Sequence, residues 1–250
     1  MGFTGIKILV ASHKPYAMPE EDIYLPILVG ATGKSRISGW ASDDLGDNIS
    51  SKNPNYCELT ALFWAWKNLS CDYLGLVHYR RHFRGRNGIV ERAELSELLA
   101  ASGVILPKKR NYFIETNRSQ YVHAHHAEDL DLTRQILTER YPSYVAAFDR
   151  SMKSCSGHRF NMFVMRRDLA DRYCEWLFDV LFELERRLDI SRYSAYDARV
   201  FGFVSERLID VWVETNGIAY DELPVLNLES QHWPRKIVGF LKRKFFGCRR

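Results

Sequence analysis

The amino-acid sequence predicts an α/β fold with a central, mostly parallel sheet flanked by helices. Short apolar runs that suit buried strands alternate along the chain with longer segments in which apolar residues recur at helical spacing. Polar residues directly follow two of the predicted strands, in the segments 12–15 and 78–82. Because ligands of open α/β sheets bind beyond the carboxyl ends of the strands, both segments are candidate binding sites.

The predicted elements follow one another without an internal repeat or a low-complexity linker. Asn53 and Pro54 suit the start of a helix, Asp168 suits the N-cap of a long helix, and Gly103 and Gly217 suit helix ends. Strands are predicted at 6–11, 27–29, 72–78, 104–107 and 160–165, with an extended segment at 219–228. Helices are predicted at 53–66, 91–101, 128–141, 168–188 and 203–215, and a polar loop at 30–53.

Basic charge is concentrated at the end of the chain. The formal net charge is +4, yet residues 235–250 hold seven of the 35 basic residues and no acidic residue. We therefore divide the chain into a domain at 1–234 and a basic tail at 235–250, and we predict no nucleic-acid partner, since the excess charge is absent from the body. Ile237, Val238, Leu241 and Phe245 fall on one helical face of the tail. Such a helix either binds an anionic membrane surface, which we favour, or docks on the body of the protein.

Cysteine usage indicates a reducing compartment. The five cysteines are an odd number without close pairing, which is typical of free thiols in a cytoplasmic protein. The first ten residues lack the pattern of a secretion signal, and no apolar run reaches the length of a membrane span. We therefore expect a cytoplasmic protein that associates peripherally with the inner face of the cytoplasmic membrane through its tail.

The segment His78-Tyr79-Arg80-Arg81-His82 follows an apolar strand and is a candidate anion site. A guanidinium presents fixed donors that match phosphate oxygens. Side chains alternate along an extended chain, so we expect one of the two arginines to face a ligand and the other to pair with an acid. A surface cluster of ion pairs is the alternative. His13 and Lys14, which follow the first strand, are predicted to join this site.

The polar loop carries clustered carboxylates. Asp43, Asp44, Asp47 and Asn48 offer oxygen ligands for a hard cation or for sugar hydroxyls, without the spacing of an EF-hand. A solvated turn is the equally weighted alternative.

Histidines cluster ahead of the fourth predicted helix. His123, His125 and His126, with Asp129, include residue types that bind zinc, although no thiol lies nearby and the spacing is not specific. A polar helix start explains the same residues, and His125 is also a candidate contact for an acceptor substrate.

Two further polar residues lie in apolar surroundings. Asn161 interrupts an apolar strand, where its amide either ties the structure together or contacts an acceptor. Glu206 stands on an otherwise apolar helix and suits a general base or a salt bridge.

Several of these segments together resemble the DUF4422 family. The likeness extends from Ile6 to about Leu228 and rests on motifs in the expected order. The matching segments are 7–14, 43–50, 53–68 (NPNYCELTALFWAWKN), 73–83 (YLGLVHYRRHF), 160–165 and 202–208.

The resemblance implies a GT-A-like glycosyltransferase of bacterial capsule, exopolysaccharide or O-antigen synthesis. It implies a UDP-linked nucleotide-sugar donor, with galactose or galactofuranose as the first sugar to test, and a lipid-linked glycan as acceptor. On this reading Asn53, His78 and Tyr79 join His13, Lys14 and the loop acids in donor binding. His125 and Asn161 contact the acceptor.

The chain departs from the wider GT-A pattern at the strand end. Many such enzymes hold a divalent metal there with Asp-x-Asp, whereas this chain has His78-Tyr79-Arg80. We expect Arg80 or Arg81 to offset the charge of the leaving diphosphate. Asp43, Asp44 and His232 leave a route to Mn²⁺ or Mg²⁺ open.

A carboxylate would take the proton of the acceptor hydroxyl as general base. Asp129 and Glu206 are the candidates, and Asp197 is a weaker one. Two other functions remain open: a metal-dependent hydrolase built on His123, His125, His126 and Asp129, and a non-catalytic partner that binds a nucleotide-sugar within a polysaccharide assembly.

Overall fold

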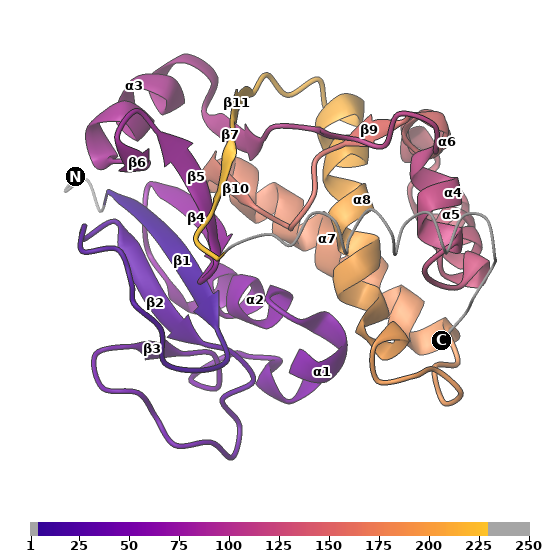
Figure 1. Ribbon diagram of the computed structural model, residues 1–250. Coiled ribbons are helices and arrows are strands. Elements are labelled where there is room, and N and C mark those ends of the chain that lie inside the picture. Colours follow the sequence, from indigo (N-terminus) through magenta and orange to yellow (C-terminus); the bar gives the residue numbers. More distant parts are fainter. Residues whose placement is uncertain (1–4, 230–250) are drawn as a thin grey trace.

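The computed structural model describes residues 5–229 and shows a twisted sheet with helices on both faces (Figure 1). The main path of the sheet runs β11-β7-β10-β4-β1-β2-β3. The strands of this path are β1 (Ile6–Ser12), β2 (Tyr24–Leu28), β3 (Ala41–Ser42), β4 (Tyr73–His78), β7 (Val104–Pro107), β10 (Phe163–Arg166) and β11 (Asp221–Leu223).

Most neighbouring strands run parallel. β1 pairs in parallel with β2 and β4, β2 with β3, and β7 with β11, whereas β10 is antiparallel to both β4 and β7. β5 (Arg81–Gly85) leaves the end of β4 and pairs with β6 (Gly88–Ile89) and β12 (Val225–Asn227). A separate pair joins β8 (Arg110–Asn111) to β9 (Ser156–Gly157). The predicted mostly parallel α/β sheet is confirmed.

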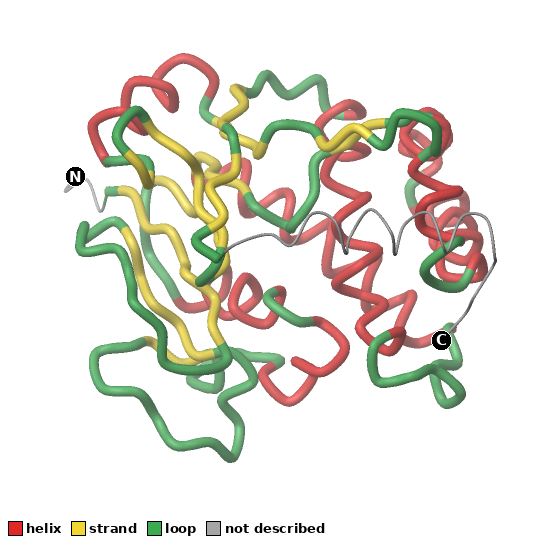
Figure 2. Tube along the Cα trace, viewed as in Figure 1, coloured by secondary structure: helices red, strands yellow, loops and turns green. Residues whose placement is uncertain are grey.

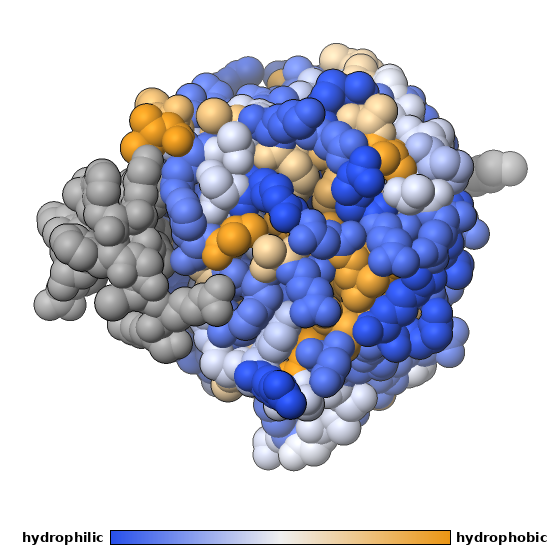
Figure 3. Space-filling view, turned by 90° about the vertical axis from the view of Figure 1, so that its right-hand side faces the viewer, coloured by the Kyte–Doolittle hydropathy of each residue, from blue (hydrophilic) through white to orange (hydrophobic). Residues whose placement is uncertain are grey.

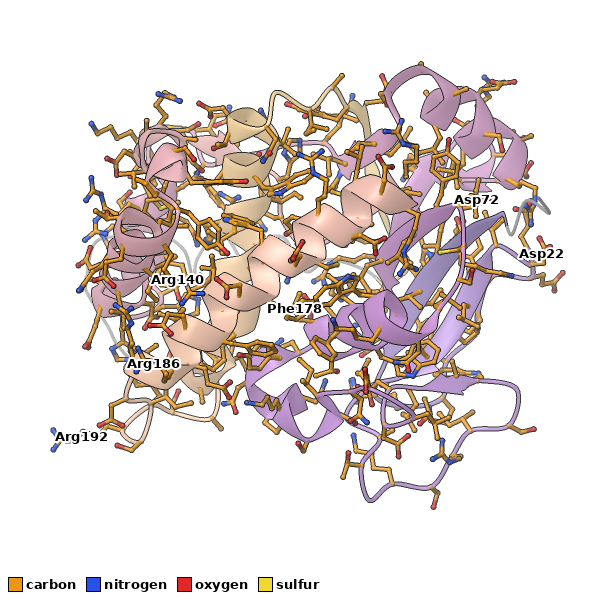
Figure 4. All side chains as sticks on the ribbon, turned by 180° about the vertical axis from the view of Figure 1, so that it is seen from behind. Asp22, Asp72, Arg140, Phe178, Arg186 and Arg192 are labelled. Atoms are coloured by element: carbon orange, nitrogen blue, oxygen red, sulfur yellow. The ribbon has the colours of Figure 1, made fainter. Side chains whose placement is uncertain are left out.

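The helices lie in two unequal groups. α3 (Arg92–Ser102) stands apart from the others, at one end of the sheet (Figure 1). The larger group includes α1 (Asn53–Tyr56), α2 (Leu59–Asn68), α4 (Asn117–Val122), α5 (Ala127–Arg140), α6 (Val145–Lys153), α7 (Arg167–Arg187) and α8 (Val200–Thr215). Short 3₁₀ turns occur at Ser50–Lys52, Pro142–Tyr144 and Asp197–Arg199. Seen from behind, α7 crosses the molecule and carries Phe178, whose ring stacks on Trp66 of α2 (Figure 4).

Alternation along β1 builds two cores. Leu9 and Ala11 belong to the larger core, which contains the buried faces of α2, α7 and α8. Ile8 and Val10 point the other way, into a smaller core with Leu95 and Leu99 of α3. Because both faces of β1 are covered, its sequence is a continuous apolar run, as expected for a central parallel strand. The polar side chains of the site are thus confined to the strand ends.

Most predicted elements are present within a few residues of their expected positions. Three details of the predicted elements are wrong: the cap at Asp168, the start of β10 and the unbroken helix from Asn53 to Trp66. Asp168 lies in the first turn of α7 and pairs with Arg166 instead of capping the helix. β10 starts at Phe163 and not at Phe160, because Phe160 and Asn161 have φ of 76° and 52°, outside the extended region. β5, α4 and α6 were not predicted.

The third wrong detail concerns the helix expected from Asn53 to Trp66. It is broken after one turn, since Cys57 has φ 54° and ψ −131°. The chain then turns at Glu58 into α2. The break places Cys57 and Glu58, both half-buried, between the two short helices.

The predicted loop over 30–53 is largely irregular and hangs beyond one end of the sheet (Figure 2). The side of the molecule formed by α4, α5 and α6, on the right of Figure 1, is mostly hydrophilic, with small separate apolar patches (Figure 3). No helix between residues 5 and 229 is long and apolar enough to cross a membrane. The predicted amphipathic tail at 235–250 lies outside the described residues, and the division of the chain at 234 stays a prediction.

His82 should make the fold sensitive to acid. It is fully buried against Tyr24, and neither ring nitrogen makes a hydrogen bond of normal geometry. Burial, with the neighbouring His78, lowers the pKa of His82 from 6.5 to about 4. The folded protein therefore binds this proton less readily than the unfolded chain does. Stability present above pH 6.5 is lost as the pH falls toward 4, by about 2 kcal/mol at pH 5.

We expect His82→Leu to remove most of this loss, because leucine has no proton to bind. Urea unfolding of parent and variant at pH 8 and pH 5 measures it. His126→Gln, at a half-exposed position, is the control and should keep the parent's pH dependence. An identical pH dependence in His82→Leu would contradict the assignment.

Candidate functional site

A cleft of about 540 Å³ opens at the carboxyl ends of β1 and β4. Its walls come from six parts of the chain: the end of β1, the residue after β2, the α1–α2 junction, the β4–β5 turn, the turn before β10 and the start of α8 with the residues just before it. The charged and polar residues among its lining are Ser12, His13, Asn53, Cys57, Glu58, His78, Tyr79, Arg80, Arg81, Tyr196, Arg199 and Glu206. The predicted location beyond the strand ends therefore coincides with a cavity large enough for a ligand.

The two neighbouring arginines have different environments. β4 ends at His78 and pairs there with Arg81, so Tyr79 and Arg80 form a two-residue turn. The exposed Arg80 guanidinium lies 3.2 Å from a carboxylate oxygen of Glu229. Arg81 lies over the Phe160 ring, 4.7 Å from its centre. Burial lowers the pKa of Arg81, although arginine remains charged at neutral pH.

Arg81 makes no ion pair with any carboxylate in the described part of the chain. The same is true of Arg199, which lies at the other side of the cleft. Arg199 is the residue before α8, and its Nε lies 3.1 Å from the Cys57 sulfur. Its guanidinium also contacts the rings of Tyr196 and Phe203. Glu58 acts electrostatically on both arginines and Glu206 on Arg81, but from beyond ion-pair distance. Two cations in one cleft that are not ion-paired with a described carboxylate favour an anionic ligand.

Asn161 connects three walls of the cleft. Its amide nitrogen donates to Glu58 Oε1 at 2.6 Å and to the Gly202 carbonyl at 3.1 Å. The neighbouring carbonyl of Phe160 lies 2.6 Å from His78 Nε2. Asn161 thus acts as the structural tie that was one of its two predicted roles. Its buried Oδ1 has no hydrogen-bond partner among the described residues.

Strained backbone surrounds the same residues. Cys57, Phe160 and Asn161 are three of the four non-glycine residues with positive φ between residues 5 and 229. Each such conformation costs on the order of 1 kcal/mol or more, and such residues concentrate at functional sites. Gly202 allows α8 to approach the Cys57 side chain closely: a Cβ there would lie 3.2 Å from the Cys57 sulfur, which would have to shift by a few tenths of an ångström.

Glu206 lies one helical turn after Gly202 and lines the cleft. Its Oε2 accepts a hydrogen bond of 3.0 Å from the buried Arg207. Its Oε1 receives no hydrogen bond from the described residues. The arrangement leaves a carboxylate oxygen that can receive a proton inside the cleft.

His13 and Tyr79 form the β1 side of the cleft. Their rings meet edge to face at 5.5 Å. Burial, followed by the charges of Lys14, Arg80 and Lys34, lowers the pKa of His13, so it is neutral at pH 7 and can accept as well as donate a hydrogen bond. Lys14 is not among the cleft-lining residues, although its ammonium lies 5.9 Å from the centre of the Tyr79 ring.

The chain matches the model of the family described as "Domain of unknown function (DUF4422)" over residues 7–217. It belongs to the DUF4422 family. Among solved structures it is similar to one titled as the apo structure of WbbM, a bifunctional glycosyltransferase, with 30% identity and a TM-score of 0.82. The similarity covers 90% of this chain and 46% of that one, so the DUF4422 protein spans about half the length of this relative. No curated protein matches.

The other predicted donor-binding residues of this DUF4422 protein bond within the protein, and most of them lie outside the cleft. Asn53 lines the cleft, but its amide nitrogen donates to the Cys57 carbonyl and to Thr60. Asp44 pairs with Arg36 and accepts from Ser42. Asp47 and Asn48 are exposed, with hydrogen bonds inside their own loop or to Asn68. None of these three loop residues lines the cleft.

Asp43 is fully buried outside the cleft and organises the loop. Its carboxylate accepts hydrogen bonds from the backbone nitrogens of Gly30 and Ala31, at 2.8 and 3.0 Å. Ser50 and Thr60 each donate a hydroxyl at 2.5 Å. Because both oxygens are occupied by protein donors, the structure offers Asp43 a structural role in place of the predicted contact with donor or metal.

Asp129 does not reach the cleft either. It is buried on α5, where its two oxygens accept hydroxyls from Tyr121 and Tyr193, each at 2.7 Å. Burial raises the pKa of Asp129. A carboxylate enclosed by two tyrosines and remote from the cleft cannot reach an acceptor there, so Glu206 is the predicted base that the structure retains.

The predicted histidine cluster separates into individual contacts. His123 Nδ1 bonds to Glu115, whereas His125 Nδ1 lies 3.4 Å from Asp197 and His126 stacks on Tyr193. Between residues 5 and 229, no three His, Cys, Asp or Glu side chains are grouped to hold a metal ion. The geometry therefore gives the hydrolase alternative no ligand set there. His232, the remaining predicted metal ligand, lies outside the described residues.

His125 and Asp197 support the cleft from behind. The His125 ring stacks on Tyr196 and Phe203, both of which line the cleft. Burial lowers the pKa of His125 to about 4. His125 itself does not line the cleft, so its predicted acceptor contact could act only through Tyr196, which is 56% exposed.

Sequence reasoning missed Glu58, Arg199 and Tyr196. Glu58 is hidden inside a run that reads as continuous helix, and the break at Cys57 is what brings it to the cleft. Arg199 and Tyr196 precede α8 by a short 3₁₀ turn, in a stretch that carries no motif. The sequence signal that could have identified Arg199 and Tyr196 is their position just before the predicted helix at 203–215, which carries the candidate residue Glu206.

Asp43→Asn should destabilise the fold without altering the cleft. It removes the charge that four donors share, and we expect a loss of about 2 kcal/mol or more in the free energy of unfolding. Urea unfolding measures this loss. Asp47→Asn, at an exposed site in the same loop, is the matched control and should change stability by less than about 0.5 kcal/mol. Equal effects of the two substitutions would contradict the structural role of Asp43.

Proposed function

We propose that this DUF4422 protein is a glycosyltransferase that takes a sugar from a nucleotide-sugar donor and transfers it to a glycan acceptor. The observation that carries the proposal is a pair of arginines in the cleft at the strand ends, Arg81 and Arg199, which make no ion pair with any described carboxylate. The relative titled as a bifunctional glycosyltransferase supports the same reaction class.

The donor diphosphate would occupy the space between these two guanidinium groups. Arginine binds phosphate oxygens with fixed, paired donors, and its charge would offset the charge that develops on the leaving diphosphate. His13 and His78 line the same cleft and would contact the donor through hydrogen bonds of their ring nitrogens. The donor is UDP-linked and the sugar a hexose, with galactose, in pyranose or furanose form, the first to test.

Transfer would join the acceptor oxygen to the anomeric carbon as the bond from that carbon to the diphosphate oxygen breaks. The hydroxyl proton would pass to Glu206, whose Oε1 is not engaged by the described residues, and the diphosphate would leave with the bonding electron pair. Glu58, already bonded to Asn161, would hold a sugar hydroxyl. The mechanism contains no step through a metal ion, because Asp43 and Asp44 direct their oxygens to protein donors.

The acceptor would be a growing glycan on a lipid carrier, at the inner face of the cytoplasmic membrane. Tyr196 offers an exposed ring at the cleft on which an acceptor sugar can stack. The basic segment 235–250 would add attraction to an anionic surface, with ~1 kcal/mol per basic residue near the membrane. This setting suits synthesis of capsule, exopolysaccharide or O-antigen.

Arg81→Ala and Arg199→Ala should each weaken UDP binding by about tenfold or more, since each removes a charge-assisted hydrogen bond. Titration calorimetry with UDP gives the dissociation constants. Arg86→Ala, which removes an exposed arginine paired with Glu97, is the control and should bind as the parent does. UDP binding that survives both cleft substitutions would rule out the arginine clamp.

Glu206→Gln should lower kcat for transfer by about 10² or more while leaving UDP affinity within about twofold, because the amide cannot accept the proton. Glu58→Gln, a carboxylate in the same cleft, should act mainly on KM. The assay measures transfer as the amount of UDP released and the amount of product formed. A protein that binds UDP-sugars but shows no turnover with any acceptor would instead be the non-catalytic partner.

A further inference from the structure

The loop between β8 and α4 presents two large apolar side chains to solvent. Phe113 is 81% exposed and Ile114 67% exposed, against 49% for Leu45 in the loop of residues 30–50. These neighbours form an apolar tip with no core behind it. Exposed aromatic and aliphatic side chains at one protruding point are typical of contacts with a membrane or a partner.

The tip is held in a strained conformation. Phe113 has φ 57°, which is unusual for a bulky residue. Its backbone nitrogen donates to Asn111 Oδ1 at 2.7 Å, and the next nitrogen, of Ile114, donates to the Tyr112 carbonyl at 2.7 Å. This tight turn directs both apolar side chains outward, at a conformational cost that the described fold does not recover through packing of Phe113.

The base of the loop is firmly attached to the body. The Tyr112 nitrogen donates to the Cys155 carbonyl, and the Asn117 nitrogen donates to the Ser154 carbonyl. The hydroxyl of Tyr112 accepts from Arg159 at 3.2 Å. Only the tip, Phe113 and Ile114, is free of such contacts to other elements.

Basic residues surround the tip. Lys108, Lys109 and Arg110 are exposed in succession just before it, and Lys153 is exposed beside Ser154, to which the loop base is bonded. The acidic residue nearest in sequence, Glu115, is buried and bonds to His123. Asp210 and Glu222 act on Lys109, so the free basic charge beside the tip comes from Lys108, Arg110 and Lys153. An apolar tip within a basic collar matches the interface of an anionic bilayer, where acyl chains lie beneath negative headgroups.

We propose that the 108–114 loop is a membrane-docking element that inserts Phe113 and Ile114 into the interface of an anionic bilayer. A second protein is the less suitable occupant, because a stable protein interface buries about 800 Å² on each side and two side chains supply much less. The loop is separate from the basic tail and belongs to the folded body.

Docking by this loop would orient the cleft. Arg159, which bonds to Tyr112 at the loop base, also donates to the backbone carbonyl of Glu206 at 3.3 Å. The loop base and the wall that holds Glu206 are therefore connected through a single buried side chain. If the proposed function holds, a loop anchored in the bilayer brings this wall to a lipid-linked acceptor, although membrane docking itself does not depend on catalysis.

The test compares vesicle binding by the full chain and a Phe113→Asn/Ile114→Ser variant. Asparagine tolerates positive φ, so the turn is kept while the apolar surface is lost. Flotation uses vesicles of phosphatidylcholine alone or with phosphatidylglycerol. Both proteins are also compared in a full-length background with Lys242, Arg243 and Lys244 changed to glutamine, which removes tail charge. Leu45→Ser is the matched control for loss of an exposed apolar side chain.

We expect the loop variant to bind anionic vesicles about tenfold or more weakly than its parent in both backgrounds, with unchanged thermal unfolding. Lys108→Glu/Arg110→Glu should weaken binding to anionic vesicles only, and Leu45→Ser should have no effect. Unchanged vesicle binding by the loop variant in the tail-neutralised background would overturn the proposal. A loop variant that self-associates less than its parent but binds vesicles equally well would also overturn the proposal. UDP binding by the same proteins is measured by calorimetry, so that failure of membrane docking can be told apart from failure of the proposed function.

Discussion

The cleft depends on the hydrogen bonds of one side chain, the Asn161 amide, to Glu58 and to the Gly202 carbonyl. These bonds join the start of α2, the turn before β10 and the first turn of α8, which lie far apart in the chain. The same turn reaches the end of β4 through the bond between Phe160 and His78. Without them, the strained backbone at Asn161 and Phe160 would relax, and the walls that carry Glu58 and Glu206 would lose their fixed separation.

The elements of the fold were largely predictable because they follow from periodicity. Strands buried on both faces and helices with an apolar stripe leave patterns in the sequence, so β1, β4, β7, α5 and α7 were found close to their true bounds. The position of the site followed from the same topology, since His13, His78, Arg80 and Arg81 come directly after β1 and β4 and do line one cleft.

The missing parts of the site depend on tertiary contacts that override local preference. Nothing in the segment 53–66 indicates that Cys57 takes positive φ; the conformation is held by packing against Gly202 and by the Arg199 contact to its sulfur. Conversely, Asp43 looked like a ligand because its sequence neighbours are polar, yet its four donors come from Gly30, Ala31, Ser50 and Thr60. The sequence shows which side chains are able to bind a ligand. The fold decides whether hydrogen bonds within the protein already use those side chains.

The two arginines of the β4–β5 turn also differ in whether a carboxylate of the protein already pairs with them. Both guanidinium groups lie over aromatic rings, Arg80 over Tyr79 and Arg81 over Phe160, and a ring attracts a cation without neutralising its charge. Of the two, only Arg80 is also paired with a described carboxylate, that of Glu229. Arg199 resembles Arg81 in this respect and contacts the rings of Tyr196 and Phe203. Aromatic rings thus contact the guanidinium groups of both Arg81 and Arg199, and among the described residues only the Nε of Arg199 is used in a hydrogen bond, to the Cys57 sulfur. A carboxylate partner would have positioned them equally well but would have competed with an anionic ligand, so the choice of rings over acids is what makes this cleft suited to a diphosphate.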